Sequence, residues 1–159
     1  YAREFEALRG ELAAVGELRL LTVSMMKTWE RYGIHALEAA YPFLPPGGWE
    51  WVANAGAEQA DIVHAHHAAG VELVLPVIYD LAGSYAWLTA QGTAGFLTAR
   101  AEDTFTMFRR QLAAFVAYLR TGRRPVPFAE TVELMRIVIA GLRSREQGGR
   151  AVPLAEIAA

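Results

Sequence analysis

Apolar residues recur along the chain at two different spacings, which separate predicted helices from predicted strands. Steps of three and four residues, typical of one face of an α-helix, run through residues 3–15, 103–121 and 129–145. A fourth helix is predicted over residues 28–41, because Thr28 is a good N-cap residue and Pro42 disfavours helical geometry at Tyr41. The turn at residues 44–48 follows, since Pro and Gly dominate it.

The strands are predicted from short apolar or alternating runs bounded by Gly, Asn or Pro. They cover residues 17–26, 49–53, 61–68, 71–79, 84–90 and 96–99, with a possible edge strand at 150–157. The order is helix, strand, helix, strand meander and two helices. This order predicts an α+β domain with an antiparallel-rich open β-sheet of about six strands.

Residues 71–79 are apolar on both alternating faces. Leu73, Leu75 and Val77 share one face, and Val74 and Ile78 share the other. A strand in a sheet with one solvent-exposed face would carry polar residues at every second position. We therefore expect helices to cover one face and a second protomer or a second domain to cover the other. A second protomer would make a homo-oligomer, either a dimer or a tetramer, and this is the arrangement we predict.

Length and composition limit the number of domains and the kinds of partner that this chain is expected to have. The chain has 159 residues, a net charge of −2 and no cysteine, which predicts a single domain over residues 1–159. Without a basic face we expect no nucleic-acid partner, and without cysteine no disulfide, thiolate nucleophile or Cys-based metal site. No apolar run approaches the ~20 residues of a membrane helix, so we expect no membrane association. The absence of cysteine leaves the compartment open and favours the cytoplasm. Tyr1 is interpreted as a trimmed end.

One helix face combines the residue types that proton transfer requires. Within residues 28–41, Arg31, His35 and Glu38 lie three or four residues apart and share a face beside the apolar stripe. Imidazole titrates near neutral pH, and its neighbours set its tautomer. His35 is therefore the candidate catalytic residue, and the alternative is a solvated ion-pair helix.

A second histidine group lies in the predicted strand 61–68. Alternation places His64 and His66 on one face, and Asp61 on the opposite face from His64. Two imidazoles without a third aimed ligand make a poor metal site. We predict ordinary strand histidines, at a subunit contact if the sheet associates.

The remaining motifs favour structural roles. Gly92-Thr-Ala-Gly95 lies between two predicted strands and lacks the following helix N-terminus of a phosphate-binding turn, and no dinucleotide or P-loop fingerprint occurs. Arg120, Arg123 and Arg124 follow a helix end, where cations favour the helix dipole; an anionic ligand is the alternative.

The order of several short motifs resembles the C-terminal part of the Gfo/Idh/MocA oxidoreductases. These motifs are Tyr32-Gly-Ile-His-Ala-Leu-Glu38, the Gly92–Gly95 turn, Phe115-Val-Ala-Tyr-Leu-Arg-Thr-Gly122 and the Arg-rich end with Gly149-Arg-Ala-Val-Pro-Leu154. The resemblance implies a substrate-binding and oligomerisation domain of an NAD- or NADP-dependent enzyme. The family's Rossmann domain, with its Glu-Lys-Pro lysine, is absent here, so no cofactor is expected to bind this chain alone.

The same resemblance assigns roles to individual residues. His35 matches the family's proton-relay histidine, whereas Arg31 stands where the family has Asp. A sugar-like or polyol hydroxyl is the implied substrate, and the predicted substrate-binding residues are Arg31, Glu38, Tyr32, Lys27 and Trp29.

The sequence therefore leaves two alternative functions open. One is a dehydrogenase domain in which His35 relays the substrate proton. The other is a non-enzymatic dimeric module that binds a small polar ligand.

Overall fold

Seven strands form one mixed sheet in the computed structural model, which describes residues 1–83 and 85–158. In chain order the strands are β1 (Leu18–Met26), β2 (Trp49–Asn54), β3 (Ala60–His67), β4 (Val71–Ile78), β5 (Ala86–Gly92), β6 (Gly95–Arg100) and β7 (Val152–Pro153). Across the sheet their order is β6-β5-β1-β4-β3-β2-β7. Only β1 and β4 pair in parallel among the described strands. The predicted α+β class and antiparallel-rich sheet are confirmed.

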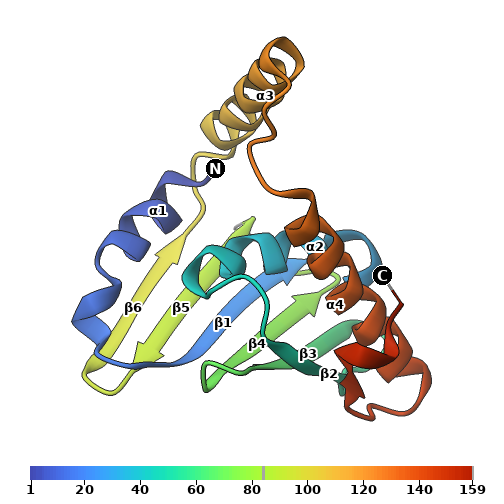
Figure 1. The fold of residues 1–159 in the computed structure, drawn as a ribbon. Coiled ribbons are helices and arrows are strands. Elements are labelled where there is room, and N and C mark those ends of the chain that lie inside the picture. The colour runs from blue at the N-terminus through green and yellow to red at the C-terminus, as the bar shows by residue number, and fades with distance from the viewer. Residues whose placement is uncertain (84, 159) are drawn as a thin grey trace.

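The helices lie on one side of this sheet. They are α1 (Arg3–Gly10), α2 (Trp29–Ala40), α3 (Thr104–Thr121) and α4 (Phe128–Glu146), with short 3₁₀ turns at Leu12–Val15, Tyr41–Phe43 and Leu154–Glu156. Figure 1 shows α2 over the middle of the sheet, α4 toward its β2 end and α1 by β6, whereas α3 projects away from the sheet.

Two predicted elements differ from the observed ones. The helix predicted over residues 3–15 is α1 followed by a separate 3₁₀ turn, broken around Gly10, which is a poor helix former. The edge strand predicted over residues 150–157 pairs only at Val152 and Pro153, because the chain then enters a 3₁₀ turn. Ser84, predicted to begin a strand, lies outside the described residues.

The core lies between the sheet and its helices. The side chains of Leu21, Val23 and Met25 on β1 and of Leu73 and Leu75 on β4 are fully buried. The residues that alternate with them, such as Thr22, Val74 and Ile78, are half-buried on the other face. The expected division of β4 into two apolar faces is therefore observed, with helices over one of them.

The start of α2 is capped from a distant strand. The backbone N–H of Trp29 donates to a carboxylate oxygen of Asp61 on β3, at 3.2 Å. Thr28 occupies the N-cap position with extended backbone but makes no side-chain cap bond. The predicted N-cap position of Thr28 is thus confirmed, but its side chain does not cap the helix. Asp61 satisfies this N–H of the first turn instead, and its negative charge suits the positive end of the helix dipole.

The described residues include no helix that is both long enough and apolar enough to cross a membrane.

A candidate active site around His35

A pocket of about 540 Å³ opens beside the helices rather than on the open sheet face. Its walls come from α1, α2, the first turns of α3, the segment before α4 and the start of α4. The residues that carry polar groups into it include His35, Glu38, Tyr85, Gln111 and Glu130. Most of these elements are far apart in sequence, so only the folded chain assembles the pocket.

His35 has a defined tautomer in this pocket. Its Nδ1 lies 3.0 Å from a carboxylate oxygen of Glu38, one helical turn further along α2. An ionised carboxylate only accepts hydrogen bonds, so Nδ1–H is the donor and Nε2 keeps its lone pair. A neutral imidazole held this way accepts a proton at Nε2 while Glu38 stabilises the resulting charge.

Two tyrosines flank the imidazole. The ring centroids of Tyr32 and His35 are 5.5 Å apart with an edge-on arrangement, and that of Tyr85 lies 5.7 Å from the His35 centroid. Burial raises the pKa of Tyr85 above its ordinary value, and the negative charge of Glu38 adds to this. Tyr85 therefore remains a neutral phenol, able to donate a hydrogen bond at neutral pH.

Tyr41 joins the pocket to α4. Its hydroxyl donates to a carboxylate oxygen of Glu133 at 2.5 Å, and the same oxygen accepts from the backbone N–H of Gly47 at 3.0 Å. Burial and this hydrogen bond raise the pKa of Tyr41. The contact fixes α4 to the turn after α2, and with it the wall of the pocket.

The predicted site residues separate into two groups. His35 and Glu38 line the pocket, and Tyr32 touches the His35 ring. Arg31 and Lys27 are exposed and, like Trp29, lie outside the pocket lining as far as the described residues show. Lys27 instead places its Nζ 5.8 Å from the ring centroid of Tyr79.

Trp29 is a core residue, which corrects its assignment to substrate binding. Its side chain has no exposed surface, and its indole N–H donates to the backbone carbonyl of Val138 at 2.9 Å. A side chain enclosed in this way cannot contact a ligand.

Sequence reasoning missed Tyr85, which comes directly before β5. In the sheet β5 pairs with β1, with Ala86 opposite Met25, so Tyr85 lies near the end of β1 from which α2 starts. The strand pattern of residues 84–90 contains no information on which strand lies beside it. The signal that could have found Tyr85 is an aromatic residue at a strand end, which by itself is weak.

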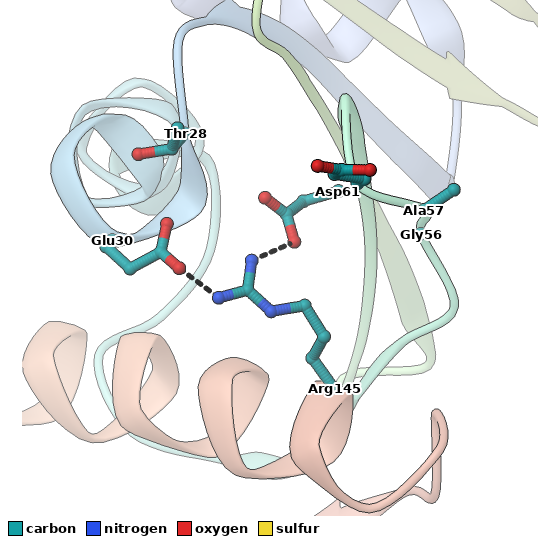
Figure 2. Close-up of a pocket in the computed structure, with 7 residues that line it drawn as sticks. Thr28, Glu30, Gly56, Ala57, Asp61 and Arg145 are labelled. Carbon is teal, nitrogen blue, oxygen red and sulfur yellow. Dashed lines mark hydrogen bonds and ion pairs between the residues drawn. The ribbon is translucent and has the colours of Figure 1, made fainter.

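A second hollow, of about 440 Å³, lies at the start of α2 and is lined by charged residues together with small ones. Figure 2 shows Arg145 of α4 reaching between Glu30 and Asp61. Its guanidinium donates to Asp61 at 2.9 Å and also to Glu30, and Asp61 accepts a further bond from Asn54 at 2.7 Å. Arg145 thus binds both carboxylates and ties α2, β3 and α4 together.

The carboxyl of Glu30 shows the strength of this pairing. Burial raises its pKa, but the hydrogen bond and charge of Arg145 outweigh burial, so the pKa is lowered. The resulting stabilisation is present above the ordinary Glu pKa and is lost as pH falls through the lowered value. We assign this hollow a structural role.

The strand histidines lie where alternation predicted them. His64 and His66 share the open sheet face, and Glu72 accepts from both of them, at 2.6 Å and 2.7 Å. Burial raises the pKa of Glu72, but these two hydrogen bonds outweigh it and lower the pKa. Within the part of the chain that the structure describes, no group of three or more His, Cys, Asp or Glu residues is arranged to hold a metal ion.

The fourth histidine holds a turn. His67 is buried on the helix-covered face, where its Nε2 donates to the carbonyl of Gly47 at 2.5 Å. Its Nδ1 accepts from the backbone N–H of Ala69 at 3.0 Å. Both ring nitrogens are therefore used to fix the loops at the end of β3.

Comparison with known proteins gives structural matches only. No family model matches the chain, and no curated protein sequence is similar to it. Among solved structures, a myo-inositol dehydrogenase from Corynebacterium glutamicum superposes with a TM-score of 0.78 at 19% identity, over 97% of this chain and 62% of that one. GenD2 from gentamicin A biosynthesis, in complex with NAD, gives 0.77 at 18% identity, over 96% and 61%.

A third structure was solved with ligands. It is myo-inositol dehydrogenase from Lactobacillus casei in complex with NAD(H) and myo-inositol, with a TM-score of 0.78 at 13% identity, over 96% of this chain and 59% of that one. The chain thus spans about three fifths of the length of the structures it matches. The fold expected from the resemblance to the Gfo/Idh/MocA oxidoreductases is confirmed: this chain has the fold of the larger part of these inositol dehydrogenases.

Proposed function

We propose that this chain is the substrate-binding and oligomerisation part of an NAD- or NADP-dependent oxidoreductase that acts on a hydroxyl of a sugar-like molecule or polyol. The observation that carries the proposal is the His35–Glu38 pair, 3.0 Å apart at the wall of a pocket of about 540 Å³. Oxidation of an alcohol requires a base for the hydroxyl proton, and Nε2 of His35 is such a base.

The rest of the pocket suits a ligand with many hydroxyl groups. Tyr85, Glu38, Gln111 and Glu130 offer both donors and acceptors, and Phe5 and Met107 provide apolar surface. A cyclic polyol presents hydroxyls at its rim and C–H groups on its ring faces. The hydroxyls can therefore bind the polar lining residues, and the C–H groups can pack on the apolar ones. Pockets of this size and mixed character are typical small-molecule sites.

The residues present do not fit a dinucleotide. The Gly-rich turn Gly92–Gly95 connects the antiparallel strands β5 and β6, so no helix N-terminus follows it to bind a pyrophosphate. We therefore place the cofactor on a different domain. This chain contributes substrate binding and the proton acceptor.

The ligands bound in the matched structures support the placement of the cofactor on a different domain. The Lactobacillus casei enzyme was solved with NAD(H) and myo-inositol, and GenD2 with NAD. About two fifths of each of these chains has no counterpart here, which is room for a cofactor domain.

The test compares residues 1–159 with the natural polypeptide that the gene encodes around them. Calorimetry on residues 1–159 is expected to detect no binding of NAD or NADP. The natural polypeptide is expected to reduce one of the two cofactors when given a member of a panel of inositols, aldoses and linear polyols. Failure of the whole panel, together with tight binding of a panel member to residues 1–159, would favour the non-enzymatic binding module instead.

The open sheet face is proposed to be the homo-oligomer interface. It exposes Trp87 and Phe96 and carries Ile62 beside the half-buried Val74 and Ile78. A row of apolar side chains on a sheet face is costly to leave in water, at ~1.5–3 kcal/mol for each large side chain that association buries.

Light scattering at micromolar concentration is therefore expected to show a dimer or tetramer, and Ile62→Lys is expected to convert it to monomer. A matched control is available on the opposite side of the molecule, since Ile62 is 39% and Ile139 of α4 is 40% exposed. Ile139→Lys should leave the assembly intact. A monomeric parent protein, or equal effects of the two substitutions, would remove the sheet face as the interface.

A further inference from the structure

The pocket around His35, which we call the His35 pocket, has more negative than positive charge on its walls. Three glutamates line it: Glu6, Glu38 and Glu130. Among the lining residues that the structure describes, only Arg9 is cationic at every ordinary pH, and His35 adds a positive charge only when it has taken up a proton. Walls with this sign of charge attract a cationic ligand and repel an anionic one.

Two of the three carboxylates already have partners. The two oxygens of Glu6 each accept from Arg110 at 2.9 Å, so the charge of Glu6 is neutralised. Glu38 binds Nδ1–H of His35 at 3.0 Å. The carboxylate of Glu130 makes no hydrogen bond or ion pair with any of the residues that the structure describes. Glu130 is therefore the glutamate of the pocket that is left for a ligand.

The position of Glu130 on α4 explains why no backbone group binds its carboxylate. It is the third residue of the helix, from which a glutamate in a capping box reaches back to the N–H of the N-cap residue. The N-cap residue here is Pro127, which has no N–H. The helix dipole favours a negative charge in this first turn, but it uses none of the hydrogen-bond acceptors of the carboxylate.

The surroundings of Glu130 place it beside Tyr41, which also lines the pocket. Glu130 is half-buried there. Burial and the hydrogen bond to Glu133 raise the pKa of Tyr41, and the nearby charge of Glu130 adds to this. Glu133 is satisfied by the Tyr41 hydroxyl and the N–H of Gly47, so Glu130 is the unpaired one of the two carboxylates near this hydroxyl.

The spacing along α2 relates this carboxylate to the proton acceptor. Tyr41 directly follows the last residue of α2. At 1.5 Å a residue, His35 and Tyr41 are about 9 Å apart along the helix axis. A six-membered ring with substituents on opposite sides can span such a distance, with one substituent at His35 and another at Glu130.

We propose that the substrate of the His35 pocket carries an amino group in addition to the hydroxyl that is oxidised, and that Glu130 binds this group as an ammonium. The assignment of the oxidised hydroxyl rests on the proposed function. An ammonium donates three hydrogen bonds and accepts none, so it complements an unpaired carboxylate. Charge-assisted hydrogen bonds of this kind are about twice as strong as neutral ones. The substrate class is therefore an amino sugar or an amino-substituted cyclic polyol.

Ligands of other charge fit the pocket less well. An acidic sugar would have Arg9 as its partner, which is exposed, and would be repelled by Glu38 and Glu130. A neutral polyol can donate a hydroxyl to Glu130, but it leaves the negative charge of the pocket without a counter-charge. The affinity difference between an amine and its neutral parent is therefore the quantity that tests the proposal.

Isothermal titration calorimetry of the natural polypeptide measures this difference without requiring turnover. The probes are glucosamine and an aminoinositol, each compared with its hydroxyl parent, glucose or myo-inositol. N-acetylglucosamine keeps the nitrogen but removes its charge. At least one amine is expected to bind at least about tenfold more tightly than its parent, since loss of one partner of a desolvated charge pair is at least that costly. Added salt is expected to weaken the binding of the amine and not that of the parent.

A pair of substitutions on α4 assigns the preference to one residue. Glu130→Gln keeps the shape of the side chain and removes its charge, and it is expected to bring the amine to within about twofold of the affinity of its parent. Glu146→Gln makes the same change at the exposed far end of α4, outside the pocket lining that the structure describes, and should leave the preference intact. The affinity for the neutral parent is expected to be the same in both variants.

Several outcomes would overturn the proposal. They are equal affinity of the amines and their parents, binding of neither amine, or a preference that persists in Glu130→Gln. Tighter binding of glucuronate than of glucose would overturn it in favour of an anionic substrate held by Arg9. A change of folding stability in Glu130→Gln without a change of ligand preference would leave Glu130 only its role at the start of α4.

The results distinguish this proposal from the proposed function. If an amine binds through Glu130 but the natural polypeptide reduces neither NAD nor NADP, the ligand class stands and the dehydrogenase assignment fails. If neutral polyols are oxidised and no amine is preferred, the dehydrogenase assignment stands and the ammonium site fails.

Discussion

Replacing His35 with Ala is expected to lower turnover of the natural polypeptide by about 10²–10⁴-fold on the polyol substrate proposed above, the range that general acid–base groups contribute. The physical reason is the fixed tautomer: Glu38 binds Nδ1–H at 3.0 Å, so Nε2 is the acceptor for the substrate proton. Steady-state kinetics give kcat and KM, and calorimetry gives cofactor affinity. Cofactor affinity is expected to be unchanged, because the proposed function places the dinucleotide on a different domain.

A histidine on the opposite face provides the control. His64 is also partly exposed and hydrogen-bonded to a glutamate, Glu72, but it lies on the open sheet face. His64→Ala should retain turnover within about twofold when the oligomeric state is unchanged. Turnover of His35→Ala within twofold of the parent would remove His35 from proton transfer, and a loss confined to KM would assign it to substrate binding.

The fold was largely predictable because its strands have a period of two. Alternation in residues 71–79 placed Leu73 and Leu75 on one face and Val74 and Ile78 on the other, as the structure has them. The same rule placed His64 and His66 together and Asp61 opposite. Side-chain direction along a strand is a local property, so sequence alone is sufficient for it.

Pairing between distant segments was not predictable in this way. Alternation put Asp61 on the helix-covered face, but it could not reveal that this carboxylate caps α2 in place of Thr28 and binds Arg145, 84 residues away. Nor could it reveal that Tyr85 reaches His35, because that contact depends on β5 lying beside β1. Contacts of this kind depend on the strand order, which the local pattern does not contain.

The candidate site likewise has a part that local spacing predicts and a part that depends on tertiary structure. His35 and Glu38 are three residues apart on one helix, so their contact follows from helical spacing. Trp29 was assigned to substrate binding on the resemblance, which does not give the direction in which its side chain points. At the start of α2 its side chain instead points into the core, against α4.

Trp29 is expected to be the residue on which the placement of α2 most depends. Its indole lies between two helical glycines: a Cβ at Gly33 of α2 would come within 2.4 Å of the ring, and one at Gly141 of α4 within 2.6 Å. Both helices thus lack a side chain where the indole fits. Because the surroundings are closely packed, removing the ring leaves a large cavity that they can only partly fill.

Trp29→Ala is accordingly expected to lower the free energy of unfolding by about 3–5 kcal/mol. Trp29→Phe keeps most of the ring but leaves the carbonyl of Val138 without its donor, so a smaller loss of about 1–3 kcal/mol is expected. Urea unfolding followed by far-ultraviolet circular dichroism measures both. Tyr79→Ala, at a half-exposed aromatic residue, serves as the control and should cost less than about 1 kcal/mol. A loss for Trp29→Ala no larger than that of the control would show that α2, and with it His35, is held in place by other contacts.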